Sequence, residues 1–156
     1  DADALLPGAG NTPVHLEKGV PVEIFAGILA QTDALAGRGD LALVPELGAA
    51  IVRRGRPRLF PDLPEALPPE RLVERLPALW RRLARDGRLV LEGAGAGEAR
   101  LAVRGQAVPR LEVSALVAGV LRELLRGAGA VAPIVRVRAA EAAGDAADRF
   151  EVRWDA

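Results

Sequence analysis

Apolar and polar residues alternate with a period of two in the last third of the chain, and apolar residues recur at helical spacing before it. Along residues 149–154, Phe, Val and Trp alternate with Arg and Glu, which is typical of a half-buried strand. The same alternation runs over residues 134–139. It also occupies residues 88–92 and 98–105, which flank the glycine-rich "GAGAG". These segments predict two β-hairpins.

The first half of the chain predicts helices and one connector. A helix begins at Pro21, because proline is favoured in the first helical turn. Asp40 is expected to cap a second helix by accepting hydrogen bonds from free backbone N–H groups. Pro45 either lies in the first turn of that helix, with its start near Val44, or kinks it. Residues 54–70 are rich in proline and predict a connector.

Two further helices complete the pattern. One begins at Pro69 or Glu70 and should break at Pro77, which has no N–H to donate. Another begins with Ser114 as its cap and ends at Gly127. A helix between two hairpins can cover one face of their sheet. The sequence therefore predicts an α+β fold, with N-terminal helices packed on a four-stranded antiparallel sheet and ββαββ order in the C-terminal half.

Length and charge suit one globular unit without a strong overall field. The chain has 156 residues, of which 1–19 are expected to be a linker or flexible terminus and 20–156 a single domain. Lys plus Arg and Asp plus Glu each number 21, so no net charge attracts nucleic acid or an anionic membrane, although local patches remain possible. No apolar run reaches the roughly 18 residues of a membrane span. The chain lacks an initiator methionine, which predicts a piece of a longer protein.

The composition disfavours most catalytic and metal chemistry. The chain has no cysteine, which excludes disulfides and thiolate metal sites. No oxidising compartment is needed, and we expect a cytoplasmic protein. His15 is the only histidine, and a solvated role is favoured over an axial ligand to heme. Ser114 is the lone serine and is far from His15 in sequence, so serine catalysis is nearly excluded. We expect no enzyme, no metal and no cofactor.

Three motifs have a functional and a structural reading. "GAGAG", residues 93–97, is a hairpin turn rather than a phosphate loop, because it joins strand to strand. "WRRLARDGR", residues 80–88, could bind phosphate or nucleic acid, but a solvated helix face with Trp80 in the core is favoured. Asp145 and Asp148 could bind a cation, but a surface turn is favoured.

The order of the short patterns resembles a known group of domains. "GRGDLALVPELG", "LPALWRR", "DGRLVLE" and "GDAADRFEVRW" resemble an uncharacterised bacterial family related to 4-vinyl reductase-type ligand-binding domains and, more distantly, to heme-NO-binding domains. The resemblance covers about residues 21–154. It implies a scaffold that encloses a small-molecule pocket between helices and sheet, often dimerises, and occurs beside signalling modules.

The metal sites of those relatives are not carried over to this chain. Zinc-binding relatives have a cysteine shortly after Gly-Asp and another before it. Here Gly144 and Asp145 match the Gly-Asp, but Asp148 stands where the cysteine would fall. The heme-NO-binding relatives ligate iron through a helical histidine, and no helix expected here contains one.

The favoured hypothesis is a non-catalytic sensory or regulatory module that binds a small apolar ligand, dimerises, or does both within a signalling protein. The alternative is an interaction or scaffold domain without such a ligand, whose partner is another protein or a second copy. Arginine is favoured at interfaces, although compositional bias explains its abundance equally well. A ligand would lie between helices and sheet, against side chains that a filled core would also use. The candidates are Phe25, Ile28, Leu79, Trp80, Val117, Leu121 and Phe150.

Overall fold

The computed structural model describes residues 20–64 and 66–155. Within them helices come first and a ββαββ arrangement follows, so the predicted α+β class is confirmed. The elements are α1 (Val22–Ala36), α2 (Val44–Leu59), α3 (Pro69–Leu83), β1 (Arg88–Gly95), β2 (Glu98–Arg104), α4 (Leu111–Gly127), β3 (Val131–Ala139), a 3-10 turn (Glu141–Ala143) and β4 (Asp148–Asp155).

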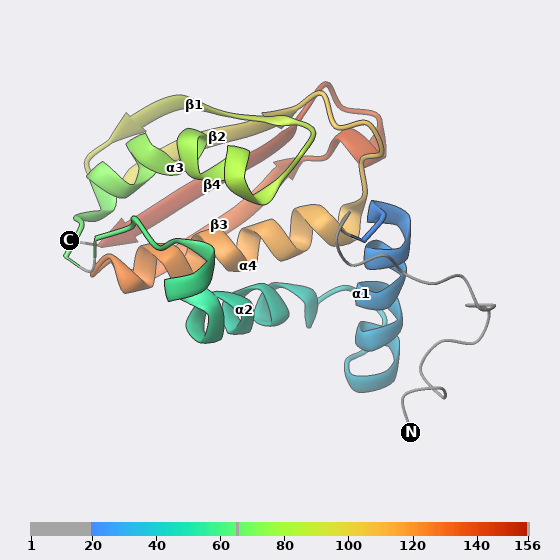
Figure 1. Cartoon of the computed structure of the whole chain (residues 1–156). Helices are drawn as coiled ribbons and strands as arrows, with labels where there is room; N and C mark the ends of the chain where they lie inside the picture. Colours follow the sequence, from blue (N-terminus) through green and yellow to red (C-terminus); the bar gives the residue numbers. More distant parts are fainter. Residues whose placement is uncertain (1–19, 65, 156) are drawn as a thin grey trace.

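The strands form one antiparallel sheet in the spatial order β1–β2–β4–β3 (Figure 1). The last strand in sequence, β4, therefore lies inside the sheet, between β2 and β3. Trp154 near its end is only 5% exposed, and its backbone N–H donates to the carbonyl oxygen of Gly97 at 2.8 Å. The predictions of a half-buried strand over residues 149–154 and of a four-stranded antiparallel sheet are confirmed.

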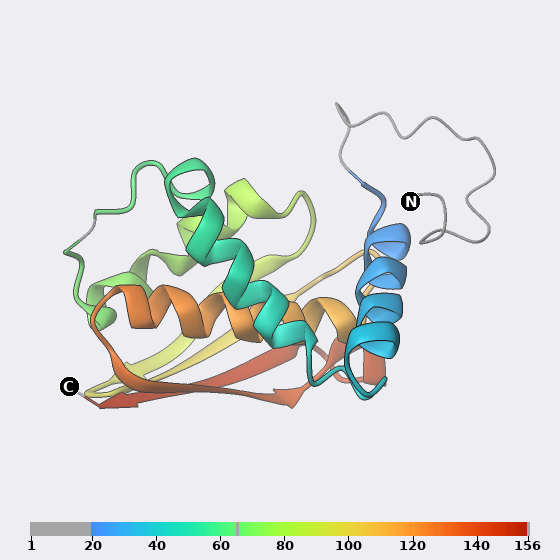
Figure 2. The ribbon, with the colours of Figure 1, turned by 90° about the horizontal axis from the view of Figure 1, so that it is seen from below.

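The helices lie on one side of the sheet (Figure 2). Helix α4 runs along this side and contacts β3, whereas α3 lies over β1. Helix α2 packs on α4 and forms an outer layer. Helix α1 stands at one end of this arrangement, near the first turn of α4 (Figures 1 and 2). No described helix covers the opposite face of the sheet.

The core fills the space between the sheet and helices α3 and α4. Strand alternation turns one set of side chains toward the helices, and helical spacing turns an apolar stripe toward the sheet. Burying each large apolar side chain contributes roughly 1.5–3 kcal/mol. The central members of this cluster are Leu72, Val73, Leu76, Leu89, Leu101, Val103, Leu121, Leu124, Leu125, Phe150 and Val152.

Two glycines bring α2 and α4 into close contact. A Cβ atom on Gly48 would meet the carbonyl oxygen of Leu116, and one on Gly119 would meet the carbonyl oxygen of Pro45. In both cases the obstructing atom belongs to backbone, which cannot rotate away as a side chain can. The absence of a side chain is therefore what allows this helix pair to approach so closely.

The expected break at Pro77 is wrong, because α3 continues through it to Leu83. A proline inside a helix removes one hydrogen bond and costs about 3 kcal/mol or more. Burial of Leu72, Val73 and Leu76 along the same helix face offsets that cost. The proline-rich connector is also shorter than expected, since α2 extends through Pro57 to Leu59.

Two expected helix caps are also wrong. Asp40 pairs with Arg38 and accepts from the N–H of Ala42, at 3.0 Å, before α2 begins. The turn into α2 is instead held by Asp33, which is fully buried and accepts from the N–H groups of Leu41 and Leu43, both at 2.8 Å. Ser114 lies inside the first turn of α4 rather than at its cap, because that helix begins at Leu111.

Candidate interaction surfaces

The residues predicted to line a ligand pocket do not form one group. Phe150 and Leu121 are buried members of the main core, and the half-buried Leu79, Trp80 and Val117 pack against it. Phe25 packs instead against a separate small cluster of Leu29, Val44 and Leu116. Ile28 is 40% exposed and belongs to neither cluster. The structure therefore brings together five of the seven candidates.

The two tryptophans differ in whether the indole N–H has a hydrogen-bond partner. Trp154 Nε1 donates to Glu70 Oε1 at 3.3 Å. Trp80 Nε1 is hidden from solvent and has no hydrogen-bond partner among the described residues. Because a buried N–H without a partner costs about 1–3 kcal/mol, the indole of Trp80 is a polar group inside the apolar layer that an acceptor would stabilise.

Asp148 is a buried hydrogen-bond centre, so its assignment to a surface turn is wrong. The residue is 2% exposed. Its Oδ2 accepts from Ser114 Oγ at 2.7 Å and from Gln106 Nε2 at 2.8 Å, and its Oδ1 accepts from the N–H of Glu141 at 2.7 Å. The side chain of Asp148 therefore joins α4, β4 and two loops through hydrogen bonds.

Metal ligands are not clustered in the part of the chain that the structure describes. No group of three or more His, Cys, Asp or Glu side chains there could hold a metal ion. His15, the only histidine, lies outside the described residues. The described core thus offers no imidazole to an iron.

Helix α1 carries apolar residues on two opposite sides. Ala26 and Leu29 are buried, and Leu29 belongs to the small cluster. Ile24, Ile28 and Leu35, which we call the α1 stripe, are 46%, 40% and 68% exposed and fall within a narrow arc on the other side. None of the described helices, α1 included, has the length and apolar character to cross a bilayer. The stripe is visible in the sequence as apolar residues at helical spacing.

The uncovered side of the sheet carries charged residues, which alternate along the strands with the buried residues of the core. One row across the strands runs from Arg100 on β2 to Glu151 on β4 and Arg136 on β3. The sequence signal was present as alternating Arg and Glu in both hairpins. We call this surface the open face and define it by Arg88, Glu92, Glu98, Arg100, Arg104, Arg136, Arg138, Arg149, Glu151 and Arg153.

Two glutamates of the open face are held by arginines. Glu92 accepts from Arg104 at 2.6 Å, and this hydrogen bond holds the pKa of Glu92 below its ordinary value, although partial desolvation opposes the effect. Glu151 accepts from Arg138 at 2.6 Å and pairs with Arg153 at 2.8 Å. The hydrogen bond from Arg138 likewise lowers the pKa of Glu151. Both carboxylates therefore keep their negative charge to a lower pH than an ordinary glutamate does.

The glycine-rich segment shapes the open face rather than making only a turn. Strand β1 runs through Gly95, and the turn is confined to Ala96 and Gly97, where Gly97 has a φ of +73°. At a bulge in β1, a Cβ on Gly93 would lie 3.1 Å from Nη2 of Arg100. The Arg100 guanidinium therefore rests where a side chain would otherwise be. Beside it is a hollow of about 420 Å³ lined by Gly93, Ala94, Gly95, Glu98, Ala99, Arg100, Glu151 and Arg153.

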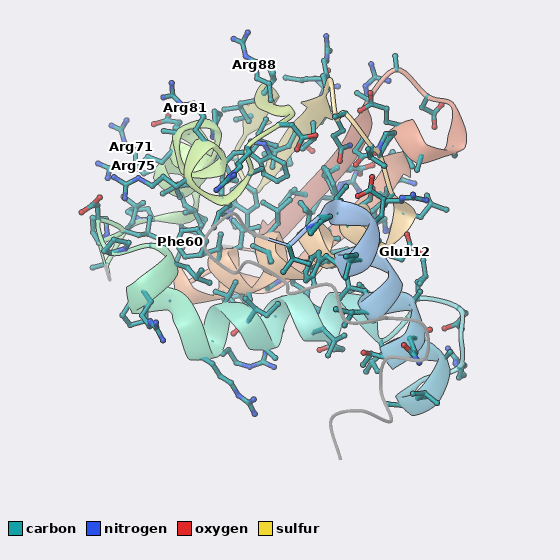
Figure 3. The ribbon with its side chains drawn as sticks, turned by 45° about the vertical axis from the view of Figure 1, so that its right-hand side comes forward. Phe60, Arg71, Arg75, Arg81, Arg88 and Glu112 are labelled. Atoms are coloured by element: carbon teal, nitrogen blue, oxygen red, sulfur yellow. The ribbon has the colours of Figure 1, made fainter. Side chains whose placement is uncertain are left out.

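The second basic surface is the solvent side of α3. Arg71, Arg75 and Arg81 project from this helix away from the core (Figure 3). Arg71 pairs with Glu74 at 3.0 Å and Arg82 with Asp62 at 2.5 Å. Within "WRRLARDGR", Arg81 and Arg82 lie on the solvated face of α3 and Trp80 is half-buried, as the structural reading predicted. The helix ends at Leu83, however, and Arg88 belongs to β1.

Solved structures with the same fold have low sequence identity to this chain. A trafficking protein particle complex subunit 3 from Naegleria fowleri, covalently bound to palmitic acid, superposes with a TM-score of 0.61 at 14% identity, over 86% of this chain and 97% of that one. A mutant Fe(II) unliganded H-NOX protein from K. algicida gives 0.53 at 9% identity, over 88% and 75%. The unmutated H-NOX protein gives 0.51 at 10% identity, over 85% and 72%.

At these identities the similarity concerns the fold alone. It agrees with the resemblance to heme-NO-binding domains at that level, while the relationship to 4-vinyl reductases stays a prediction. No curated protein is significantly similar to the chain in sequence. One family does match: its sequence model covers residues 16–155. The chain therefore belongs to the family described as protein of unknown function (DUF2378).

Proposed function

We propose that this domain is a non-catalytic interaction module of a regulatory protein, and that it forms a homodimer through the α1 stripe. The observation that carries the proposal is the exposure of Ile24, Ile28 and Leu35 on one side of a helix whose other side is already buried. A helix that is apolar on both sides gains stability when the second side is also covered. Burying three such side chains contributes roughly 1.5–3 kcal/mol each.

A second copy fits this surface better than an unrelated partner. The α1 stripe has no charge of its own, and Glu23 and Arg38 lie beyond its two ends. In an antiparallel pair of α1 helices with its centre near residue 30, Glu23 of one copy comes near Arg38 of the other, which follows the end of α1 and pairs with Asp40 of its own chain at 3.3 Å. Gly27 borders the stripe, and a Cβ there would have no atom of this chain within 4 Å. Its small size allows two helices to approach closely.

The non-catalytic part of the proposal rests on what the polar groups already do. Ser114 is 2% exposed, and its hydroxyl donates to the carboxylate of Asp148, which is equally buried. Both groups are occupied in holding α4 to β4 and are shielded from solvent. One solved neighbour is a subunit of a trafficking complex, which is in line with this fold serving assembly.

Sedimentation equilibrium over a range of concentrations tests the dimer. We expect the wild-type domain to dimerise and I24E/I28E to be monomeric, with at least about tenfold weaker association because charges enter an apolar contact. The matched control is Ile51→Glu on α2, where the side chain is equally exposed at 41%. Circular dichroism verifies that each variant folds. A monomeric wild type, or equal loss of association in I51E, would rule out dimerisation through α1.

A second candidate function is binding of a small apolar ligand, favoured by the unpartnered Trp80 Nε1 next to the core. An apolar molecule with a hydrogen-bond acceptor could enter between α3 and the sheet and accept from the indole. One structural neighbour is described as covalently bound to palmitic acid. Native mass spectrometry with added palmitic acid tests this function, with Trp80→Phe as the variant. Absence of a bound species from both the purified and the supplemented protein would remove this candidate.

A further inference from the structure

The open face concentrates positive charge in a chain whose total charge is zero. Its seven arginines (88, 100, 104, 136, 138, 149 and 153) outnumber its three glutamates (92, 98 and 151), which leaves an excess of four positive charges. The rest of the chain must carry the compensating negative charge. Charge is therefore segregated onto this side of the sheet, although the composition as a whole predicts no field.

The arginines of this surface exceed the carboxylates available to them. Among the described residues, Arg88, Arg100 and Arg136 form no ion pair, whereas Glu151 already serves two other arginines. The Arg100 guanidinium lies along β1 at Gly93 and borders the hollow. Arg136 lies on the next strand but one, across Glu151. The sheet positions the guanidinium groups of Arg100 and Arg136, and their N–H donors have no carboxylate partner among the described residues.

We propose that the open face docks an acidic, extended segment of a partner protein, with its carboxylates bound by Arg100 and Arg136. A guanidinium fork matches a carboxylate in bidentate geometry, and such charge-assisted pairs are about twice as strong as neutral hydrogen bonds. In an extended segment, alternate side chains point to the same side and can meet the rows of the sheet together. This surface lies on the opposite side of the sheet from the helices, so the proposal stands independently of self-association through α1.

The chemistry of the face favours an acidic protein over nucleic acid. Single-stranded nucleic acid binds through basic grooves combined with aromatic stacking, and the open face has no aromatic side chain. Glu98 and Glu151 border the hollow and would repel a continuous run of phosphates. The partner surface that fits a mixed array with excess arginine is one with mostly acidic and a few basic groups.

Fluorescence anisotropy with a labelled peptide of alternating glutamate and serine tests the proposal. We expect the wild-type domain to bind this probe, and R100E/R136E to bind at least about tenfold more weakly. The matched control is R75E/R81E on α3, which makes the same change in net charge at two exposed arginines without ion pairs among the described residues. This control should bind within about twofold of wild type. Binding should also weaken as salt is raised.

Three results would overturn the proposal. The first is no binding of the peptide by the wild-type domain at low salt. The second is an equal loss in R100E/R136E and R75E/R81E, which would mean that only net charge matters. The third is tighter binding, abolished by R100E/R136E, of a single-stranded oligonucleotide or of phosphatidylserine vesicles than of the peptide. I24E/I28E should retain full peptide binding, which keeps this test separate from that of the dimer.

Discussion

The two faces of the sheet are built from the same strands but have opposite compositions. On β4, Phe150 and Val152 face the helices and are at most 1% exposed, whereas Arg149 and Arg153 face solvent. The inner side chains are fixed by neighbours on several elements. The outer ones form ion pairs between exposed groups, which typically contribute 0–1 kcal/mol. Stability is thus concentrated on one face, and the other is free to vary its charges for binding.

The largest effect should separate the two faces at adjacent positions. We expect Phe150→Ala to lower the free energy of unfolding by about 3–5 kcal/mol, because it leaves a cavity at the centre of the core. Arg149→Ala on the same strand should change it by no more than about 0.5 kcal/mol. Urea denaturation followed by circular dichroism measures both. Similar losses in the two variants would contradict the division between the faces.

A smaller effect should arise one layer farther from the sheet, where α2 packs on α4. Gly119→Ala would place a Cβ against the Pro45 carbonyl, and we expect it to cost about 1–3 kcal/mol because the helices must separate. Gly55→Ala on α2 is the matched helical control, since its Cβ would meet only the flexible side chain of Leu59. That variant should be neutral or stabilising by up to about 1 kcal/mol. Thermal unfolding compares the two; a neutral Gly119→Ala would mean that α2 and α4 can move apart at no cost.

The sheet and its covering helices could be predicted from the sequence because each follows from local spacing. The alternation around Phe150 decides both the strand and the side it buries, and the segment between two such hairpins has to lie on their apolar face. Even the place of Trp154 inside the sheet follows from pairing the last strand. What alternation could not supply was the function of the outer face, since exposed charges usually mean only solvation.

Features that depend on distant residues could not be predicted. Asp33 caps a turn that begins several residues later, and Asp148 meets Ser114 only after β4 is placed beside α4. Local rules assigned those tasks to Asp40 and to Ser114 as a cap. Pro77 was read as a break because propensity is local, whereas the burial of α3 that offsets its cost is tertiary. For the proposed ligand site, core and pocket residues have the same composition, so sequence could not separate Phe150 from Ile28.

The smallest effect concerns the ion pairs of the open face and their dependence on pH. The folded state lowers the pKa of Glu92 through the hydrogen bond from Arg104, so its contribution is present above the unfolded pKa and is lost as pH falls through the lower folded value. At neutral pH, Glu92→Gln should destabilise the domain by about 0.2–1 kcal/mol. The difference from wild type should shrink toward zero on acidification below about pH 4. Urea titrations at several pH values measure it, with Glu98→Gln as the control from the same face without an ion pair among the described residues. If the Glu92→Gln difference were as large as that of Phe150→Ala, the outer face would be part of the stabilising core and could not vary its charges freely.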